Sequence, residues 1–221
     1  MRENVIETIK KEKLIAIVRG IAPEKCLKVA GALYAGGFRL VEITFDQKNP
    51  DSWATTAAAI KAVSEAYSGT MEVGAGTVTS VELVELAASA GAKYIISPDT
   101  NIDVIKRTRE LGLVSMPGAL TPTEIVAAHN AGADIVKLFP AGNLGVNYIK
   151  AVRAPLAYIP MTAVGGVKPE NVSEFLNAGV CGFGVGGQLV PAKAVREGDY
   201  AAVEARAKAF TQAIADWEAA K

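Results

Sequence analysis

Residues 113–140 read LVSMPGALTPTEIVAAHNAGADIVKLFP, and this stretch decides the fold. It begins with Leu113 to Met116, which is too short for a helix and apolar on both alternations, as a parallel strand covered on both faces would be. Thr121 to Glu124 then has the pattern of a helix start, with an N-cap threonine, a proline at the first helical position and a glutamate that completes a capping box. Gly132 can take the left-handed conformation that ends a helix, and a second apolar run follows over Asp134 to Phe139.

The same alternation of short apolar runs and amphipathic segments fills the chain. Apolar runs occur at Leu14 to Val18, Arg39 to Thr44, Met71 to Gly74, Lys93 to Ser97, Leu113 to Met116, Asp134 to Phe139, Ile159 to Val164 and Cys181 to Val185. Strict alternation favours a parallel sheet, and eight units of this size favour a closed barrel. Extra helices are expected near Glu3 to Lys11 and Tyr200 to Ala219, and Thr79 with Glu82 predicts a further capping box. We therefore predict an α/β fold in which residues 1–221 form a single (β/α)8 TIM barrel domain with an extra N-terminal helix.

Composition and charge exclude several classes of partner. The chain has 221 residues, is 50% hydrophobic and 21% charged, and carries 23 basic and 23 acidic residues. A net charge of zero gives no general attraction to nucleic acid or to an anionic membrane surface. Met1 to Lys13 lacks the apolar core of a signal peptide, and no apolar stretch is long enough to span a bilayer. Because Cys26 and Cys181 also suit a reducing compartment, we expect a cytoplasmic protein.

Lys137 is the unusual residue of the sixth run, since it stands in the otherwise apolar segment Ile135-Val136-Lys137-Leu138-Phe139. Active sites of (β/α)8 barrels lie at the C-terminal ends of the strands. Lysine is rarely buried because desolvation disfavours its charged form, and a neutral amine can attack a ketone. The alternative is a lysine that reaches solvent from the end of a strand or forms half of a structural ion pair.

Glu42 places a second charge in a buried run, Leu40-Val41-Glu42-Ile43-Thr44. Period-two alternation puts Glu42 and Thr44 on one side of their strand, and the same choice on other strands brings Arg19 and Lys137 to the same mouth of the barrel. The structural alternative is a buried salt-bridge cluster. Such clusters stabilise poorly because desolvation offsets the attraction, so a functional role is favoured.

Glycine-rich segments predict an anion pocket at the same mouth. Gly165 and Gly166 follow the seventh run, and Gly186 and Gly187 follow the eighth, which are the two loops that hold phosphate in many barrels. The segment Gly74-Ala75-Gly76-Thr77 offers further backbone donors for a carboxylate. The lone His129 lies within a predicted helix, and His, Cys, Asp and Glu show no metal-ligand spacing, so neither a metal nor another cofactor is expected.

These motifs together resemble the bacterial family of 2-keto-3-deoxy-6-phosphogluconate aldolases, which includes 4-hydroxy-2-oxoglutarate aldolases and phosphogalactonate relatives. The resemblance runs nearly end to end. The motifs that carry it are Ile17-Val18-Arg19-Gly20, Val41-Glu42-Ile43-Thr44, Gly74-Ala75-Gly76-Thr77-Val78, Ile96-Ser97-Pro98, Met116-Pro117-Gly118, Thr121-Pro122-Thr123-Glu124, Val136-Lys137-Leu138-Phe139-Pro140 and Gly165-Gly166-Val167.

The resemblance implies a class I aldolase in which Lys137 forms a Schiff base with pyruvate. It also implies that Glu42 moves protons through water and that Thr77 holds the pyruvate carboxylate, with Arg19 close by. The predicted substrate-binding residues are Arg19, Thr44, Thr77, Pro98, Phe139, Gly165, Gly166, Gly186 and Gly187. Members of the family are typically homotrimers that need no metal, so the expected partners are a small 2-keto acid and further copies of the chain.

Two positions depart from the family pattern. Family members that cleave phosphogluconate often carry arginine four residues after the glutamate, where this chain has Asp46, and a hydroxyl residue where it has Gly187. Both departures weaken the prediction of a phosphorylated substrate and leave the Schiff-base chemistry unaffected. Two other functions stay open from the sequence. One is a phosphate-binding barrel epimerase or isomerase with Lys137 as a general base, and the other is a non-catalytic barrel that binds a sugar acid.

Overall fold

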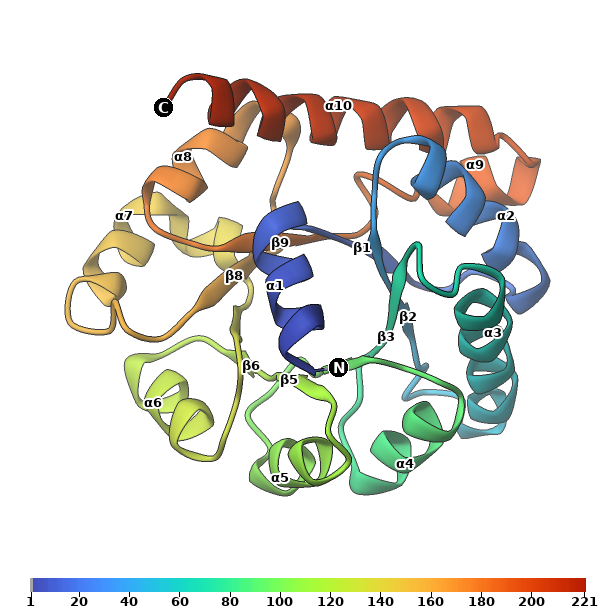
Figure 1. The fold of residues 1–221 in the computed structure, drawn as a ribbon, viewed down its shortest axis with the longest axis horizontal. Coiled ribbons are helices and arrows are strands. Elements are labelled where there is room, and N and C mark those ends of the chain that lie inside the picture. The colour runs from blue at the N-terminus through green and yellow to red at the C-terminus, as the bar shows by residue number, and fades with distance from the viewer. Residues whose placement is uncertain (1) are drawn as a thin grey trace.

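A barrel of nine parallel strands, enclosed by helices, makes up the computed structural model, which describes residues 2–221 (Figure 1). The strands are β1 (Leu14–Val18), β2 (Leu40–Thr44), β3 (Glu72–Gly76), β4 (Tyr94–Ile96), β5 (Val114–Met116), β6 (Gly118–Ala119), β7 (Val136–Leu138), β8 (Met161–Val164) and β9 (Gly182–Val185). Their order around the sheet is β5-β4-β3-β2-β1-β9-β8-β7-β6, and all the pairs are parallel. The predicted α/β barrel is therefore confirmed.

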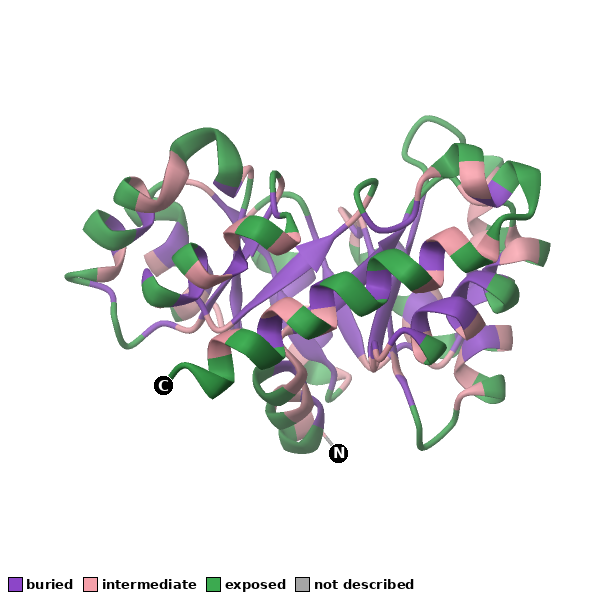
Figure 2. Ribbon diagram, turned by 90° about the horizontal axis from the view of Figure 1, so that it is seen from above, coloured by how far each residue is buried: buried purple, intermediate pink, exposed green. Residues whose placement is uncertain are grey.

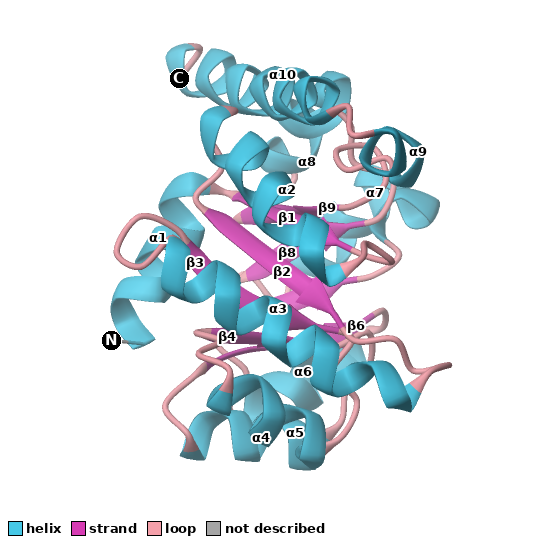
Figure 3. Ribbon diagram, turned by 90° about the vertical axis from the view of Figure 1, so that its right-hand side faces the viewer, coloured by secondary structure: helices cyan, strands magenta, loops and turns pink. Residues whose placement is uncertain are grey.

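Helices follow the strands in alternation and cover the outside of the barrel (Figure 3). They are α1 (Arg2–Glu12), α2 (Pro23–Ala35), α3 (Trp53–Ala66), α4 (Val81–Ser89), α5 (Ile102–Glu110), α6 (Pro122–Asn130), α7 (Ala141–Arg153), α8 (Val172–Asn177), α9 (Ala192–Glu197) and α10 (Tyr200–Ala219), with 3-10 turns at Pro50–Ser52 and Pro169–Asn171. The extra helices predicted at the two ends of the sequence are α1 and α10. Among residues 2–221, none of these helices has both the length and the apolarity to cross a bilayer.

Pro117 explains why nine strands are found where eight were predicted. It separates β5 from β6, which would otherwise be one continuous strand, because proline has no N–H to donate to a sheet. β5 pairs with β4, and β6 pairs with β7. The backbone N–H of Asp134 donates to Ser115 at 3.0 Å and that of Lys137 donates to Pro117 at 2.9 Å. These hydrogen bonds join β5 and β6 to the segment that contains β7, and they close the barrel.

Apolar side chains fill two separate layers. One layer lies between the sheet and the surrounding helices, whose outer faces remain exposed (Figure 2). The other lies inside the barrel, where residues such as Ile15, Leu40 and Tyr94 pack with Val5 and Ile9 of α1. The helix α1 therefore plugs the N-terminal end of the barrel (Figure 1). The opposite end, where the strands finish, stays accessible.

Local helix signals were only partly correct. The capping box of Thr121 and Glu124 at the start of α6 is confirmed. The box predicted for Thr79 and Glu82 is wrong, because α4 begins one residue later with Ser80 as its N-cap. The hydroxyl of Thr79 instead donates to Gln47 Oε1 at 3.0 Å. Thr79 is thereby tied to the loop after β2.

Candidate active site

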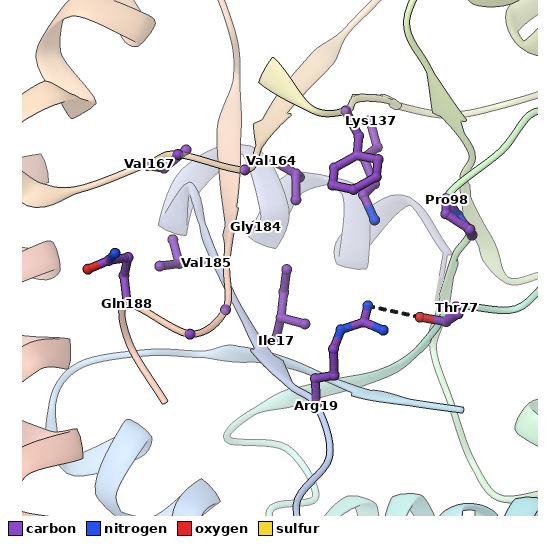
Figure 4. Close-up of a pocket in the computed structure, with 15 residues that line it drawn as sticks. Ile17, Arg19, Thr77, Pro98, Lys137, Val164, Val167, Gly184, Val185 and Gln188 are labelled. Carbon is purple, nitrogen blue, oxygen red and sulfur yellow. Dashed lines mark hydrogen bonds between the residues drawn. The ribbon is translucent and has the colours of Figure 1, made fainter. Parts of the chain in front are cut away.

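A cavity of about 380 Å³ opens at the C-terminal ends of the strands. Most of the predicted substrate-binding residues line it together with Lys137 (Figure 4). The lining residues are Ile17, Arg19, Thr77, Pro98, Lys137, Phe139, Val164, Gly165, Gly166, Val167, Gly184, Val185, Gly186, Gly187 and Gln188. The strand ends and the loops after them thus converge on one hollow, as the sequence predicted.

Lys137 lies at the centre of β7 and is only 5% exposed. Its register places it between Gly118 of β6 and Thr162 of β8, so the side chain points into the barrel and reaches the cavity (Figure 4). The Nζ atom is 5.0 Å from the centroid of the Phe139 ring. Burial lowers the pKa of the Lys137 ammonium, the charge of Glu42 opposes that shift, and Arg19 reinforces it. Lys137 is therefore poised to lose its proton more readily than an ordinary lysine.

Glu42 is even more deeply buried, with 1% of its surface exposed. Its Oε2 atom has no hydrogen-bond partner among the described residues. Burial raises the pKa of the Glu42 carboxyl, and the charges of Lys137 and Arg19 act in the opposite direction. The amine and the acid are electrostatically coupled, and burial favours the neutral form of each. Both groups can therefore carry or release a proton under conditions in which an exposed lysine and glutamate would stay charged.

Arg19 and Thr77 form the wall of the cavity across from Lys137 (Figure 4). The guanidinium of Arg19 donates to Thr77 Oγ1 at 3.0 Å. Thr77 has a φ of 58°, in the left-handed region that a β-branched residue rarely adopts. Backbone strain of this kind concentrates at ligand-binding positions. The predicted proximity of Arg19 to Thr77 is thus present.

Two glycine loops form the other end of the cavity. Gly165 and Gly166 have φ values of 92° and 75°, which only glycine adopts freely. In the second loop, a turn closes through a hydrogen bond of 2.8 Å from Leu189 N–H to Gly186 O. The backbone N–H groups of Gly187 and Gln188 donate to no group within residues 2–221. They are therefore available to an anion in the cavity.

Thr44 and Asp46 lie outside the lining of this cavity. Both line a neighbouring pocket of about 730 Å³, which shares Arg19 and Thr77 with the first. The Thr44 hydroxyl donates to Val18 O at 3.4 Å, and Asp46 Oδ1 accepts the backbone N–H of Lys48 at 2.9 Å. Asp46 thus stabilises the loop after β2, which the sequence alone did not indicate. Substrate binding by Thr44 stays a prediction.

Several residues at this end of the barrel were not predicted from the sequence. Ile17, Val164 and Gln188 line the cavity. Thr162, beside Lys137, has a buried hydroxyl without a partner among the described residues. The alternation of Thr162 and Val164 along β8 would have indicated both. The contact of Gln47 with Thr79 had no local signal.

The described part of the chain contains no group of three or more His, Cys, Asp or Glu residues arranged to hold a metal ion. His129 lies in the last turn of α6, with its ring 5.4 Å from that of Tyr158. Burial raises the pKa of the Cys26 thiol to about 11, and it raises the pKa of Cys181 as well. Neither thiol is activated as a nucleophile.

The fold and the cavity define a barrel enzyme with a buried lysine at its open end. Residues 5–206 match the model of the aldolase family described as KDPG and KHG aldolase. The chain belongs to this family, and it is an aldolase, a carbon–carbon lyase. The recognition of the family from sequence motifs is confirmed.

Individual relatives agree with the family match. The chain is 38% identical over 205 residues to the 2-dehydro-3-deoxy-6-phosphogalactonate aldolase of Escherichia coli (strain K12), covering 92% of this chain and 97% of the relative. It is 30% identical over 214 residues to the 2-dehydro-3-deoxy-phosphogluconate aldolase of Treponema pallidum (strain Nichols), covering 95% and 97%. A solved structure described as native KDPGal superposes with a TM-score of 0.83 at 37% identity, covering 93% of this chain and 96% of that one.

Proposed function

We propose that the protein cleaves a 2-keto-3-deoxy sugar acid to pyruvate and an aldehyde through a Schiff base on Lys137. The observation that carries the proposal is that Lys137 is only 5% exposed and yet lines the cavity at the strand ends. Burial lowers its pKa, which increases the fraction of the nucleophilic amine. The buried carboxyl of Glu42, whose charge acts on the pKa of Lys137, supports a role as the proton carrier. The family membership supports the same reaction type.

The reaction begins when the neutral Nζ of Lys137 attacks C2 of the keto acid and a C–N bond forms. The resulting carbinolamine loses its hydroxyl as water and becomes an iminium. When the C3–C4 bond breaks, its electron pair moves into the iminium and leaves an enamine, while the C4 hydroxyl gives up its proton and becomes the aldehyde. The enamine is then protonated at C3, and water releases pyruvate from Lys137. Glu42 accepts and returns these protons through water, as its raised pKa allows.

The two ends of the cavity suit the two ends of such a substrate. Arg19 and Thr77 stand where the keto-acid carboxylate would lie next to Lys137. The unpaired N–H groups of Gly187 and Gln188 suit a distal phosphate. Relatives named for phosphogalactonate are 38% and 40% identical to this chain, and one named for phosphogluconate is 30% identical. We therefore propose a 2-keto-3-deoxy-6-phosphogalactonate substrate, with the gluconate epimer as the comparison.

Release of pyruvate tests the proposal directly. The purified enzyme is mixed with each 6-phosphate epimer and with the unphosphorylated acids, and pyruvate is followed with lactate dehydrogenase and NADH. We expect turnover with a 6-phosphate, and loss of turnover by more than about a thousandfold in Lys137→Met. Lys150→Met is the matched control, because Lys150 is an exposed lysine of α7. A folded Lys137→Met variant with undiminished turnover would reject Lys137 as the nucleophile.

The alternatives left open by the sequence have less support. An epimerase or a silent sugar-acid-binding barrel would share the fold, whereas the matched family consists of aldolases. The homotrimer implied by the resemblance stays a prediction, which light scattering of the purified protein tests.

A further inference from the structure

Gln47 makes two hydrogen bonds next to the cavity without lining it. It follows β2 and lines the neighbouring pocket. Its Nε2 donates to the backbone carbonyl of Thr77 at 2.8 Å, and its Oε1 accepts the hydroxyl of Thr79 at 3.0 Å. Thr77, which lines the cavity, is the residue through which these hydrogen bonds connect Gln47 to a ligand there.

The backbone conformation of Thr77 is intrinsically unfavourable, so contacts such as the hydrogen bond from Gln47 are required to hold it. Its φ of 58° is one of two positive φ values for non-glycine residues among the described residues, and the other, Lys13, lies at the opposite end of the barrel. A β-branched residue holds this conformation only where surrounding contacts fix it. Arg19 fixes the hydroxyl of Thr77 and Gln47 fixes its carbonyl. A return to negative φ would reorient both groups and break both contacts.

Gln47 is itself held in place on both sides. The Thr79 hydroxyl donates to Oε1, which leaves the NH₂ end of the amide facing Thr77. The carbonyl of Thr79 accepts Asn101 Nδ2 at 3.3 Å, and Asn101 is the N-cap of α5. The indole of Trp53 donates to the carbonyl of Asp46 at 2.9 Å and so anchors the loop that carries Gln47. A continuous set of hydrogen bonds thus links the start of α5 to the wall of the cavity.

We propose that Gln47 is a positioning residue that holds Thr77 in the conformation in which it receives the carboxylate of the keto acid. The proposal rests on the proposed function, because it assigns pyruvate to the part of the cavity between Lys137 and Thr77. Gln47 acts on the binding of the keto acid and leaves the chemistry at Lys137 unchanged. Its removal should therefore weaken pyruvate binding without slowing adduct formation at saturation.

The test measures the rate of borohydride trapping of pyruvate at increasing pyruvate concentration. Gln47→Met keeps the length of the side chain and removes both hydrogen bonds, whereas Gln47→Ala also removes its bulk. In both variants we expect the half-saturating pyruvate concentration to rise roughly three- to tenfold, because the hydrogen bond that holds Thr77 is lost, with less than about a twofold change in the maximal rate. Thr79→Val should shift it in the same direction by a smaller factor. Asn49→Ala, an exposed neutral residue of the same loop, is the control that should change nothing.

Each outcome decides between positioning and a merely structural role. An unchanged half-saturating concentration in folded Gln47→Met and Gln47→Ala overturns the proposal. An equal rise in Asn49→Ala also overturns it, since the effect would then come from loosening of the loop. Wild-type protein that forms no adduct at all would instead reject the Schiff-base function, so the two failures are distinguishable.

Discussion

The carboxylate of Glu42 lies over Gly76, so closely that a Cβ at position 76 would come within 2.5 Å of Glu42 Oε2. The same Cβ would lie 2.9 Å from the Thr44 methyl carbon. Gly74, also on β3, is covered in the same way by Tyr94. A Cβ added at position 74 would lie 2.2 Å from an atom of the Tyr94 ring. The two inward glycines of β3 therefore leave room for large side chains from the neighbouring strands β2 and β4. In this way Gly74 and Gly76 shape the interior below the cavity without contributing a side chain.

Gly76→Ala should displace the Glu42 carboxylate and lower turnover. If Glu42 moves the protons of the reaction, we expect kcat to fall roughly a hundredfold or more, while unfolding stability falls by about 1–3 kcal/mol from overpacking. Steady-state pyruvate release and chemical denaturation measure the two effects. Gly69→Ala is the control, because a Cβ there meets no atom within 4 Å and Gly69 lies outside the cavity lining; its positive φ of 76° should cost stability while kcat stays unchanged. Full activity in a folded Gly76→Ala protein would show that the position of Glu42 is unimportant.

The pH dependence of trapping should respond in opposite directions to two substitutions. Adduct formation needs the neutral amine, so its rate at saturating pyruvate rises with pH through the pKa of Lys137. Glu42 raises this pKa and Arg19 lowers it. Glu42→Gln should therefore move the rising limb of the rate against pH to lower pH, and Arg19→Met should move it to higher pH.

The quantity measured is the pH at the midpoint of the rise in trapping rate. This midpoint does not depend on how far each variant slows the reaction. Arg196→Gln, which changes an exposed arginine of α9 outside the cavity lining, should leave the midpoint unchanged. Midpoints that stay fixed, or that move the same way in both variants, would contradict the electrostatic coupling of Lys137 with Glu42 and Arg19.

Gly187→Ser should improve the binding of a phosphorylated substrate. The position has free space for a side chain and lies in the loop that lines the cavity and has unpaired N–H groups at Gly187 and Gln188. An added hydroxyl can donate a hydrogen bond to phosphate, so we expect KM for the 6-phosphate to fall roughly three- to tenfold. KM for the unphosphorylated acid should stay the same in Gly187→Ser, and Gly187→Ala should leave both values unchanged. Equal changes for the two acids would place the phosphate elsewhere.

Most of the barrel could be predicted because its signals are local. Strands buried on both faces give short apolar runs, and the capping box of Thr121 and Glu124 marks the start of α6 from residues three apart. Strand ends were less predictable. The run Met71 to Gly74 is observed as Glu72–Gly76, because pairing with β2 and β4 extends β3 through two small residues. The division of one predicted strand into β5 and β6 at Pro117 was not predicted. Pro117 lacks an N–H, but the division also requires that β6 pair with β7, which is a tertiary contact.

The candidate site was predictable to the extent that it depends on alternation. Inward alternation brought Lys137 and Glu42 into the barrel interior, and both are buried there. Alternation does not fix how a strand leaves the barrel, so Thr44 was expected in the cavity and lines the neighbouring pocket. The contact between Gln47 and Thr77 joins residues 30 positions apart through a loop, which no periodic pattern encodes.

The most direct test of the central claim is reduction of the protein with sodium borohydride in the presence of pyruvate, followed by intact mass measurement and peptide mapping. Formation and reduction of an iminium should add one pyruvate-derived group, with the modification on Lys137 and none in Lys137→Met. Lys150→Met should be modified like the wild type. A folded wild-type protein that stays unmodified, or one modified at another lysine, would contradict the assignment of Lys137 as the Schiff-base residue.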